Sequence, residues 1–134
     1  MSQSSDSSSS SSAGTPPLSI TIAGLAAKLG MAKSDQHPVI LDVRRAPAFE
    51  AASHTISGAL RIAPDALAAA IPHLSRARPV IACCVHGHEV SQNAARALID
   101  AGIDASFLEG GITAWSEAGQ AVMPKPAPWQ ADAQ

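Results

Sequence analysis

Residues 79–90 read PVIACCVHGHEV, an apolar run that ends in a polar loop with one glycine. The run at 79–83 is short and apolar, which predicts a strand with no exposed face, as in a parallel sheet. Ser91 is expected to cap the helix that follows, which Gly102 ends and whose apolar positions recur with helical periodicity at Ala94, Ala95, Leu98 and Ile99. A strand that passes through a short loop into a helix predicts an α/β fold.

The same alternation of strand and helix extends in both directions from this stretch. Further strands are expected at 39–43, 59–62 and 105–108, with an extended piece at 18–20. Helices are expected at 22–30, 46–52, 64–71 and after Gly110-Gly111, where the last helix carries Trp115 into the core. Strands separated by helices of this length pair in parallel. We therefore predict a central, mostly parallel sheet of four to five strands with helices on both faces.

Composition limits the domain organisation and the partners. The chain has 134 residues, and the Ser-rich run near its N-terminus predicts a disordered tail at 1–15. The remaining length predicts one domain at 18–123, followed by a loose C-terminal tail at 124–134. The formal net charge of -2 gives no reason to expect a nucleic-acid or anionic-membrane partner. The sequence shows neither a secretory signal nor an apolar run of membrane-spanning length, so a soluble cytoplasmic protein is expected.

The two cysteines are the clearest candidates for chemistry. Cys83 and Cys84 are sequence neighbours, so they are poorly placed to cross-link distant parts of the domain. Cys84 is predicted at the strand end, before a helix N-terminus that favours a thiolate, and Gly87 allows the loop to turn its amides inward. Cys83 is expected on the opposite side of the strand, packed in the core. Cys84 is therefore the predicted nucleophile.

Other polar groups are expected on the same rim. Asp42 and Arg44 follow another predicted strand, and ligands of parallel sheets bind at the carboxyl ends of strands. His86 and His88 alternate with Cys84, but three ligands on one tight turn lack a fourth partner, so no metal site is predicted. The two histidines are expected to line the mouth of the pocket.

Four ordered motifs resemble the single-domain rhodaneses, the sulfurtransferases that carry a persulfide on a cysteine. They are Leu41-Asp42-Val43-Arg44, His54-Thr55-Ile56-Ser57-Gly58-Ala59, Cys84-Val85-His86-Gly87 and the segment 108–115, which reads LEGGITAW. The resemblance covers roughly residues 18–122. It implies a three-layer rhodanese-like domain in which Cys84 takes a sulfane sulfur from a donor such as thiosulfate and yields it to a thiophilic acceptor.

The expected substrate contacts and partners are as follows. The loop residues Val85, His86, Gly87, His88, Glu89 and Val90 are expected to bind substrate. Asp42 and Arg44 are expected to be mainly structural, with Arg44 holding an acidic or carbonyl partner across the rim, and Arg44 is also a candidate substrate contact. The partners are a small sulfur donor and a thiophilic acceptor, which can be a small molecule or a protein. Neither a metal nor an organic cofactor is required.

The loop departs from the family pattern in two ways. Family members commonly have Arg-Ser where this chain has Glu89 and Val90, and Ala94-Ala95 arrive one residue late, as in a longer loop. A longer loop is a feature of the related phosphatases and arsenate reductases, but those enzymes need an arginine that Val90 does not supply. Sulfur transfer is therefore the leading prediction. The alternatives are a non-catalytic rhodanese module that binds a partner or senses redox state, and an oxyanion-handling enzyme.

Overall fold

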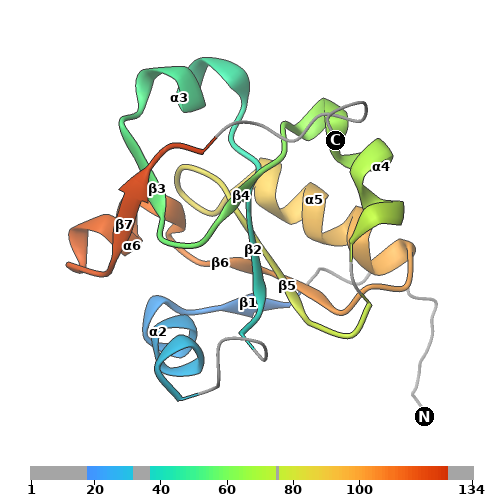
Figure 1. Ribbon diagram of the computed structural model, residues 1–134, viewed down its shortest axis with the longest axis horizontal. Coiled ribbons are helices and arrows are strands. Elements are labelled where there is room, and N and C mark those ends of the chain that lie inside the picture. The colour runs from blue at the N-terminus through green and yellow to red at the C-terminus, as the bar shows by residue number, and fades with distance from the viewer. Residues whose placement is uncertain (1–17, 32–36, 75, 127–134) are drawn as a thin grey trace, which may run out of the picture.

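A parallel five-stranded sheet forms the centre of the computed structural model, which describes residues 18–31, 37–74 and 76–126 (Figure 1). The strand order is β1-β6-β5-β2-β4, and every neighbouring pair is parallel. These strands are β1 (Ser19–Ile20), β2 (Val39–Asp42), β4 (Leu60–Arg61), β5 (Val80–Cys83) and β6 (Ala105–Leu108). The predicted mostly parallel α/β sheet is confirmed.

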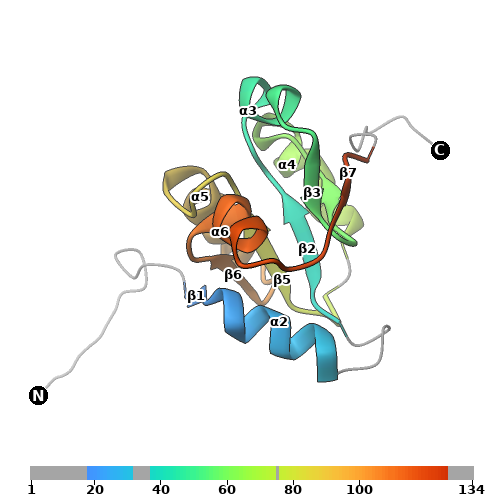
Figure 2. The same ribbon diagram turned by 90° about the vertical axis from the view of Figure 1, so that its left-hand side faces the viewer.

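Helices cover both faces of this sheet (Figures 1 and 2). One face carries α2 (Ile22–Met31) and α6 (Gly111–Glu117), and the other carries α4 (Leu67–Ala70) and α5 (Glu89–Asp100). A further helix, α3 (Ala46–Ala51), follows β2 directly. The arrangement has three layers, as expected for a sheet that is too apolar to leave a face in water.

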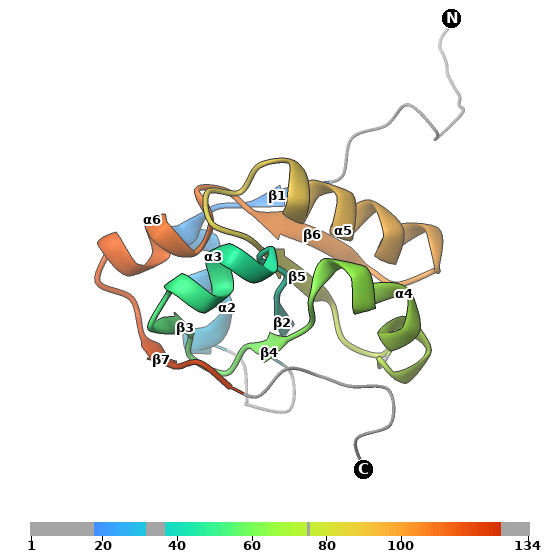
Figure 3. The ribbon, with the colours of Figure 1, turned by 90° about the horizontal axis from the view of Figure 1, so that it is seen from above.

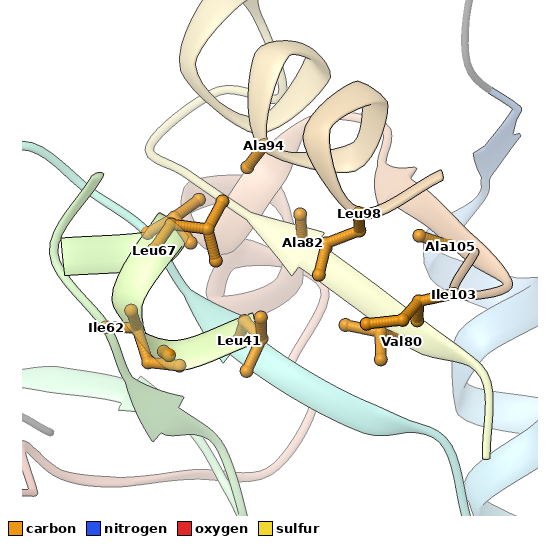
Figure 4. Packing of buried hydrophobic residues seen from close by; sticks show 11 residues of the cluster. Leu41, Ile62, Leu67, Val80, Ala82, Ala94, Leu98, Ile103 and Ala105 are labelled. Atoms are coloured by element: carbon orange, nitrogen blue, oxygen red, sulfur yellow. The ribbon is translucent and has the colours of Figure 1, made fainter. Parts of the chain in front are cut away.

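Two buried clusters show why the central strands contain so few polar residues. In β5, Val80 and Ala82 pack toward α4 and α5, whereas Ile81 and Cys83 pack toward α2 and α6. Successive strand residues point to opposite faces, so a strand covered on both sides must be apolar throughout. Figure 4 shows the first cluster, in which Leu98 of α5 lies over β5.

A second, two-stranded sheet lies outside these predictions. The strands β3 (His54–Ile56) and β7 (Val122–Pro124) pair antiparallel and lie side by side in Figure 2. Pro124, the first residue of the expected C-terminal tail, therefore ends a strand, and Lys125 Nζ donates a hydrogen bond to Phe49 O at 2.7 Å. The expected disordered tail at 1–15 and residues 127–134 lie outside the described residues.

Two helices differ in detail from the prediction. The segment 64–71 is a short α-helix between two 3-10 turns, η4 (Pro64–Ala66) and η5 (Ile71–His73), because Pro72 has no amide hydrogen to continue the helical ladder. The helix α5 begins at Glu89 with His88 at its N-cap, so the prediction that Ser91 caps this helix is wrong. Within the described ranges, no helix has the length and apolar character needed to cross a membrane.

Candidate active site

The loop between β5 and α5 opens onto a cavity of about 230 Å³ that contains Cys84 in its wall. β5 is the central strand of the sheet, between β6 and β2, so the loop that follows it begins at the carboxyl end of the central strand. The cavity brings together nearly all of the predicted site residues, and its lining consists of Arg44, Arg45, Ala48, Cys84, Val85, His86, His88, Glu89 and Val90. Gly87 is the one predicted residue outside this lining.

Several carbonyl groups of the loop accept hydrogen bonds from α5 and α6. The amides of Ile112 and Thr113, in the first turn of α6, donate to Cys84 O at 2.8 Å and to Val85 O at 3.0 Å. Gly87 O accepts a hydrogen bond from Gln92 Nε2 at 3.3 Å. Across the described part of the chain, the amides of residues 85–88 have no acceptor. The loop therefore offers unpaired N–H donors to a ligand.

Two glycines allow α6 to approach the loop this closely. A Cβ on Gly87, whose φ is +76°, would lie 2.5 Å from Leu108 O, and one on Gly111, whose φ is +67°, would lie 2.5 Å from both Cys84 O and Val85 O. A side chain at either position would meet backbone atoms, so the loop or α6 would have to shift, and the substituted residue would also adopt a strained conformation. The absence of a side chain at Gly87 therefore allows the loop to lie close against the end of β6 and the start of α6.

Ser91 is a site residue that the sequence alone did not identify. Its hydroxyl oxygen accepts a hydrogen bond from Cys84 Sγ at 3.1 Å and donates one to His88 O at 3.2 Å. A hydroxyl rotates freely, so it can donate to the sulfur once the thiol has lost its proton. Ser91 is buried in the first turn of α5. From the sequence it was interpreted as the N-cap of this helix, and that interpretation gave no reason to expect a contact with Cys84.

The second cysteine is separated from the cavity, as predicted. Cys83 is fully buried among the residues that pack against α2 and α6. Burial raises the pKa of the Cys83 thiol well above its usual value, and the nearby Asp42 carboxylate adds to this effect. Cys83 is therefore a neutral core residue, whereas Cys84 lines the cavity.

Arg44 lies in the cavity wall but its guanidinium group is already occupied. Its Nε and Nη2 donate to the two carboxylate oxygens of Asp42 at 3.0 and 2.7 Å, and Nη2 also donates to His54 O at 2.9 Å. Asp42 is completely buried, and such a carboxylate requires a cation beside it. Arg44 therefore acts mainly as the partner of Asp42.

A second buried arginine, which the sequence did not indicate, completes this cluster. Arg61 Nη1 donates to Asp42 O at 3.1 Å and to Arg44 O at 2.5 Å, and its guanidinium carbon lies 4.1 Å from the centre of the Phe49 ring. Burial lowers the pKa of Arg61, and the Asp42 carboxylate opposes this shift. Arg61 holds together the carboxyl ends of β2 and β4 beneath α3.

Arg45 is the exposed cation of the site. Its side chain lines the cavity, and it has neither a hydrogen bond nor an ion pair to any residue that the structure describes. Arg45 is the N-cap residue of α3, at the point where the chain leaves the sheet. The predicted contact was its neighbour Arg44, which belongs to the motif Leu41-Asp42-Val43-Arg44, whereas Arg45 lies directly after that motif.

The histidines lie at the cavity mouth without a metal-binding arrangement. His86 and His88 are both exposed, and their ring centres are 6.1 Å apart. No group of three or more His, Cys, Asp or Glu side chains in the described ranges is arranged to hold a metal ion. Glu89, one of the predicted substrate contacts, is exposed at the cavity wall in the first turn of α5.

Comparisons with known proteins agree with the motifs. The family model described as "Rhodanese-like domain" matches residues 25–118. The thiosulfate sulfurtransferase GlpE of Shewanella oneidensis is 39% identical over 80 residues, which cover 59% of this chain and 76% of the relative.

Solved structures show the same fold. A rhodanese-like domain protein from Staphylococcus aureus matches with a TM-score of 0.67 and 29% identity over 81% of this chain and 99% of its own. A full-length protein from Lactobacillus plantarum matches with a TM-score of 0.70 and 26% identity over 81% of this chain and 88% of its own.

Proposed function

Because the chain belongs to the rhodanese-like domain family, we propose that it is a sulfurtransferase in which Cys84 carries the transferred sulfur as a persulfide. The donor is a small sulfane-sulfur compound such as thiosulfate, and the acceptor is a thiophilic nucleophile, either a small molecule or a protein thiol. The reaction takes place in the cytoplasm, where thiols remain reduced.

The chemistry consists of two displacements at sulfur. The Cys84 thiolate attacks the outer sulfur of thiosulfate, the S–S bond of thiosulfate breaks, and sulfite leaves with the bonding electron pair. The acceptor then attacks the outer sulfur of the persulfide. The bond from this sulfur to Sγ breaks, and its electron pair regenerates the thiolate. Electrons balance in each step, so no further oxidant or reductant is needed.

The unpaired amides of residues 85–88 are the observation that carries this proposal. A persulfide anion on Cys84 requires donors around its outer sulfur, and backbone N–H groups in a turn are suited to a compact anion. The Ser91 hydroxyl lies 3.1 Å from Sγ and can rotate to donate to the sulfur once the thiol has lost its proton. Of the predicted substrate contacts, we therefore assign the loop amides to the transferred sulfur.

We propose that Arg45, instead of Arg44, binds the part of thiosulfate that leaves as sulfite. The sulfite that leaves thiosulfate carries the displaced charge, and a guanidinium group binds such an oxyanion well. Arg44 is held by Asp42 and His54 O, whereas Arg45 faces the cavity without another partner among the described residues. The cation that the loop lacks is thus supplied by the turn between β2 and α3.

Intact-mass analysis after incubation with thiosulfate tests the proposal. The parent protein and Cys83→Ala should each gain one sulfur atom, and Cys84→Ser should gain none. Cyanide should then remove the added sulfur and restore the original mass.

The two alternatives predict other results. A protein that gains no sulfur from thiosulfate or from a small persulfide is a binding module, and this result refutes the proposal. Turnover of an aryl phosphate or of arsenate, without a sulfur adduct, would identify an oxyanion enzyme.

A further inference from the structure

A second hollow of about 280 Å³ adjoins the Cys84 cavity between α4 and α5. Arg45 and Val90 line both spaces, so the two are neighbours with a shared wall. The remaining lining comes mainly from apolar side chains: Pro64, Leu67, Ala68, Ile71, Ala94 and Ala97, together with Asn93. We call this second space the α4–α5 groove.

The groove runs along one stripe of α5, away from the thiol loop. Val90, Ala94 and Ala97 are four and three residues apart, and residues at such spacing share a face of a helix. Seven residues of helix span roughly 10 Å, since each residue rises about 1.5 Å. Figure 3 shows α4 and α5 flanking this region, and Figure 4 shows Leu67 and Ala94 on the two helices.

The residues that line the groove differ in exposure. Leu67 and Ala94 are buried and form the floor, whereas Ala68 and Ala97 are exposed. The α4–α5 groove is mainly apolar, and Arg45 borders it on the side of the Cys84 cavity. Such a groove favours a ligand with an aliphatic chain and with a negative charge near Arg45.

We propose that the α4–α5 groove binds the aliphatic arm of an alkyl thiol acceptor, whose thiolate reaches the persulfide past Val90 and Arg45. This inference rests on the proposed sulfur transfer and names the acceptor class for it. The alkyl thiolate attacks the outer sulfur of the Cys84 persulfide, the Sγ–S bond breaks, and the products are an alkyl persulfide and the Cys84 thiolate. Cyanide, which has no arm, reacts without the groove.

The test uses the full chain, charged with thiosulfate and freed of excess donor. Ethanethiol, butanethiol and hexanethiol are added separately, and loss of the added sulfur is followed by intact mass. The apparent second-order rate constant should rise about twofold per methylene, since a methylene half removed from water contributes about half of its transfer free energy. Arg45→Gln should slow all three thiols by the same factor and leave the chain-length dependence intact.

Two substitutions that fill the groove separate this inference from the proposed function. Ala97→Phe and Ala68→Phe place a ring in the groove from opposite walls, and Ala27→Phe is a matched control at an exposed position of α2, on the other face of the sheet. Both groove variants should abolish the chain-length dependence while charging by thiosulfate and discharge by cyanide continue. Ala27→Phe should behave as the parent.

Each other outcome contradicts the inference. An unchanged chain-length dependence in both groove variants would show that the arm binds elsewhere, and equal rates for the three thiols in the parent would show that no arm binds. If both groove variants also lost cyanide transfer, the groove would not be separable from the thiol cavity, which refutes the inference too. Failure of the parent to charge with any donor would refute the proposed function and this inference together.

Discussion

Replacing Gly111 with alanine tests whether α6 holds the thiol loop in its active shape. The new Cβ would lie 2.5 Å from Cys84 O and from Val85 O, so α6 must withdraw and the two hydrogen bonds donated by its first turn must lengthen or break. Loss of both bonds costs about 2 kcal/mol. Alanine at a φ of +67° adds about 1–2 kcal/mol of strain.

Gly119→Ala is the matched control for this substitution. Gly119 has a φ of +78°, but a Cβ there would meet nothing within 4 Å, so only the strain of about 1–2 kcal/mol applies. The free energy of unfolding of Gly111→Ala should therefore be lower than that of Gly119→Ala by about 2 kcal/mol. For a domain of this size the melting temperatures should differ by about 8 °C or more.

Urea unfolding gives the stabilities, and the rate of charging by thiosulfate gives the function. We expect Gly111→Ala to charge at least about tenfold more slowly, since a loss of about 1.4 kcal/mol in transition-state stabilisation has this effect. Gly119→Ala should charge at the parent rate. Equal stabilities and equal charging rates in the two variants would refute the view that contact with α6 orients the loop.

Three further predictions concern neighbouring groups. Ser91→Ala removes the hydroxyl 3.1 Å from Sγ, so charging by thiosulfate should slow about tenfold; an unchanged rate would remove Ser91 from the site. Because burial raises the pKa of Cys83 in the folded state, the unfolded chain loses this proton first, and stability should fall as the pH rises above about 8.5. Cys83→Ala should reduce that slope in urea unfolding measured between neutral and alkaline pH, and an identical slope would contradict the assignment. Arg44→Met should lower the free energy of unfolding by about 3–5 kcal/mol because it leaves Asp42 buried without its main partner, whereas Asp42→Asn combined with Arg44→Met should recover part of the loss.

The central sheet was predictable because its signal is local. The run that ends at Cys83 is apolar at every position, and this pattern has few interpretations other than a strand covered on both faces. The strand Ala105–Leu108 was predicted with its observed bounds, and Trp115 is buried as expected. Each of these features depends on residues close together in the chain.

The second sheet was missed because its signal is not local. The strands β3 and β7 have three residues each, and residues 54 and 124 are far apart in the chain although they are partners in the fold. So few residues cannot display a strand period. The interaction of Lys125 with Phe49 depends on the same long-range contact.

The roles of individual side chains at the candidate site also depend on contacts that the sequence does not reveal. The motif located Cys84 and its loop, but adjacent arginines at the end of β2 could not be told apart from the sequence. Arg44 turns back to the carboxylate two residues earlier in the chain, whereas Arg45 begins α3 and remains exposed. The distinction depends on which guanidinium group the buried Asp42 engages.

The charges around Asp42 explain how a loop without arginine can serve an anion. One buried carboxylate contacts two buried guanidinium groups, Arg44 at 2.7 Å and Arg61 at 3.9 Å, and Arg61 also interacts with the charges of Glu50 and Asp65. Arg45 adds a positive charge at the cavity wall, where Glu89 is the opposing carboxylate. Arg45, at the start of α3, is therefore the cation that the proposed function assigns to an anion in the cavity. The loop itself needs to supply only amides, and it can do so because α6 binds its carbonyl groups from behind.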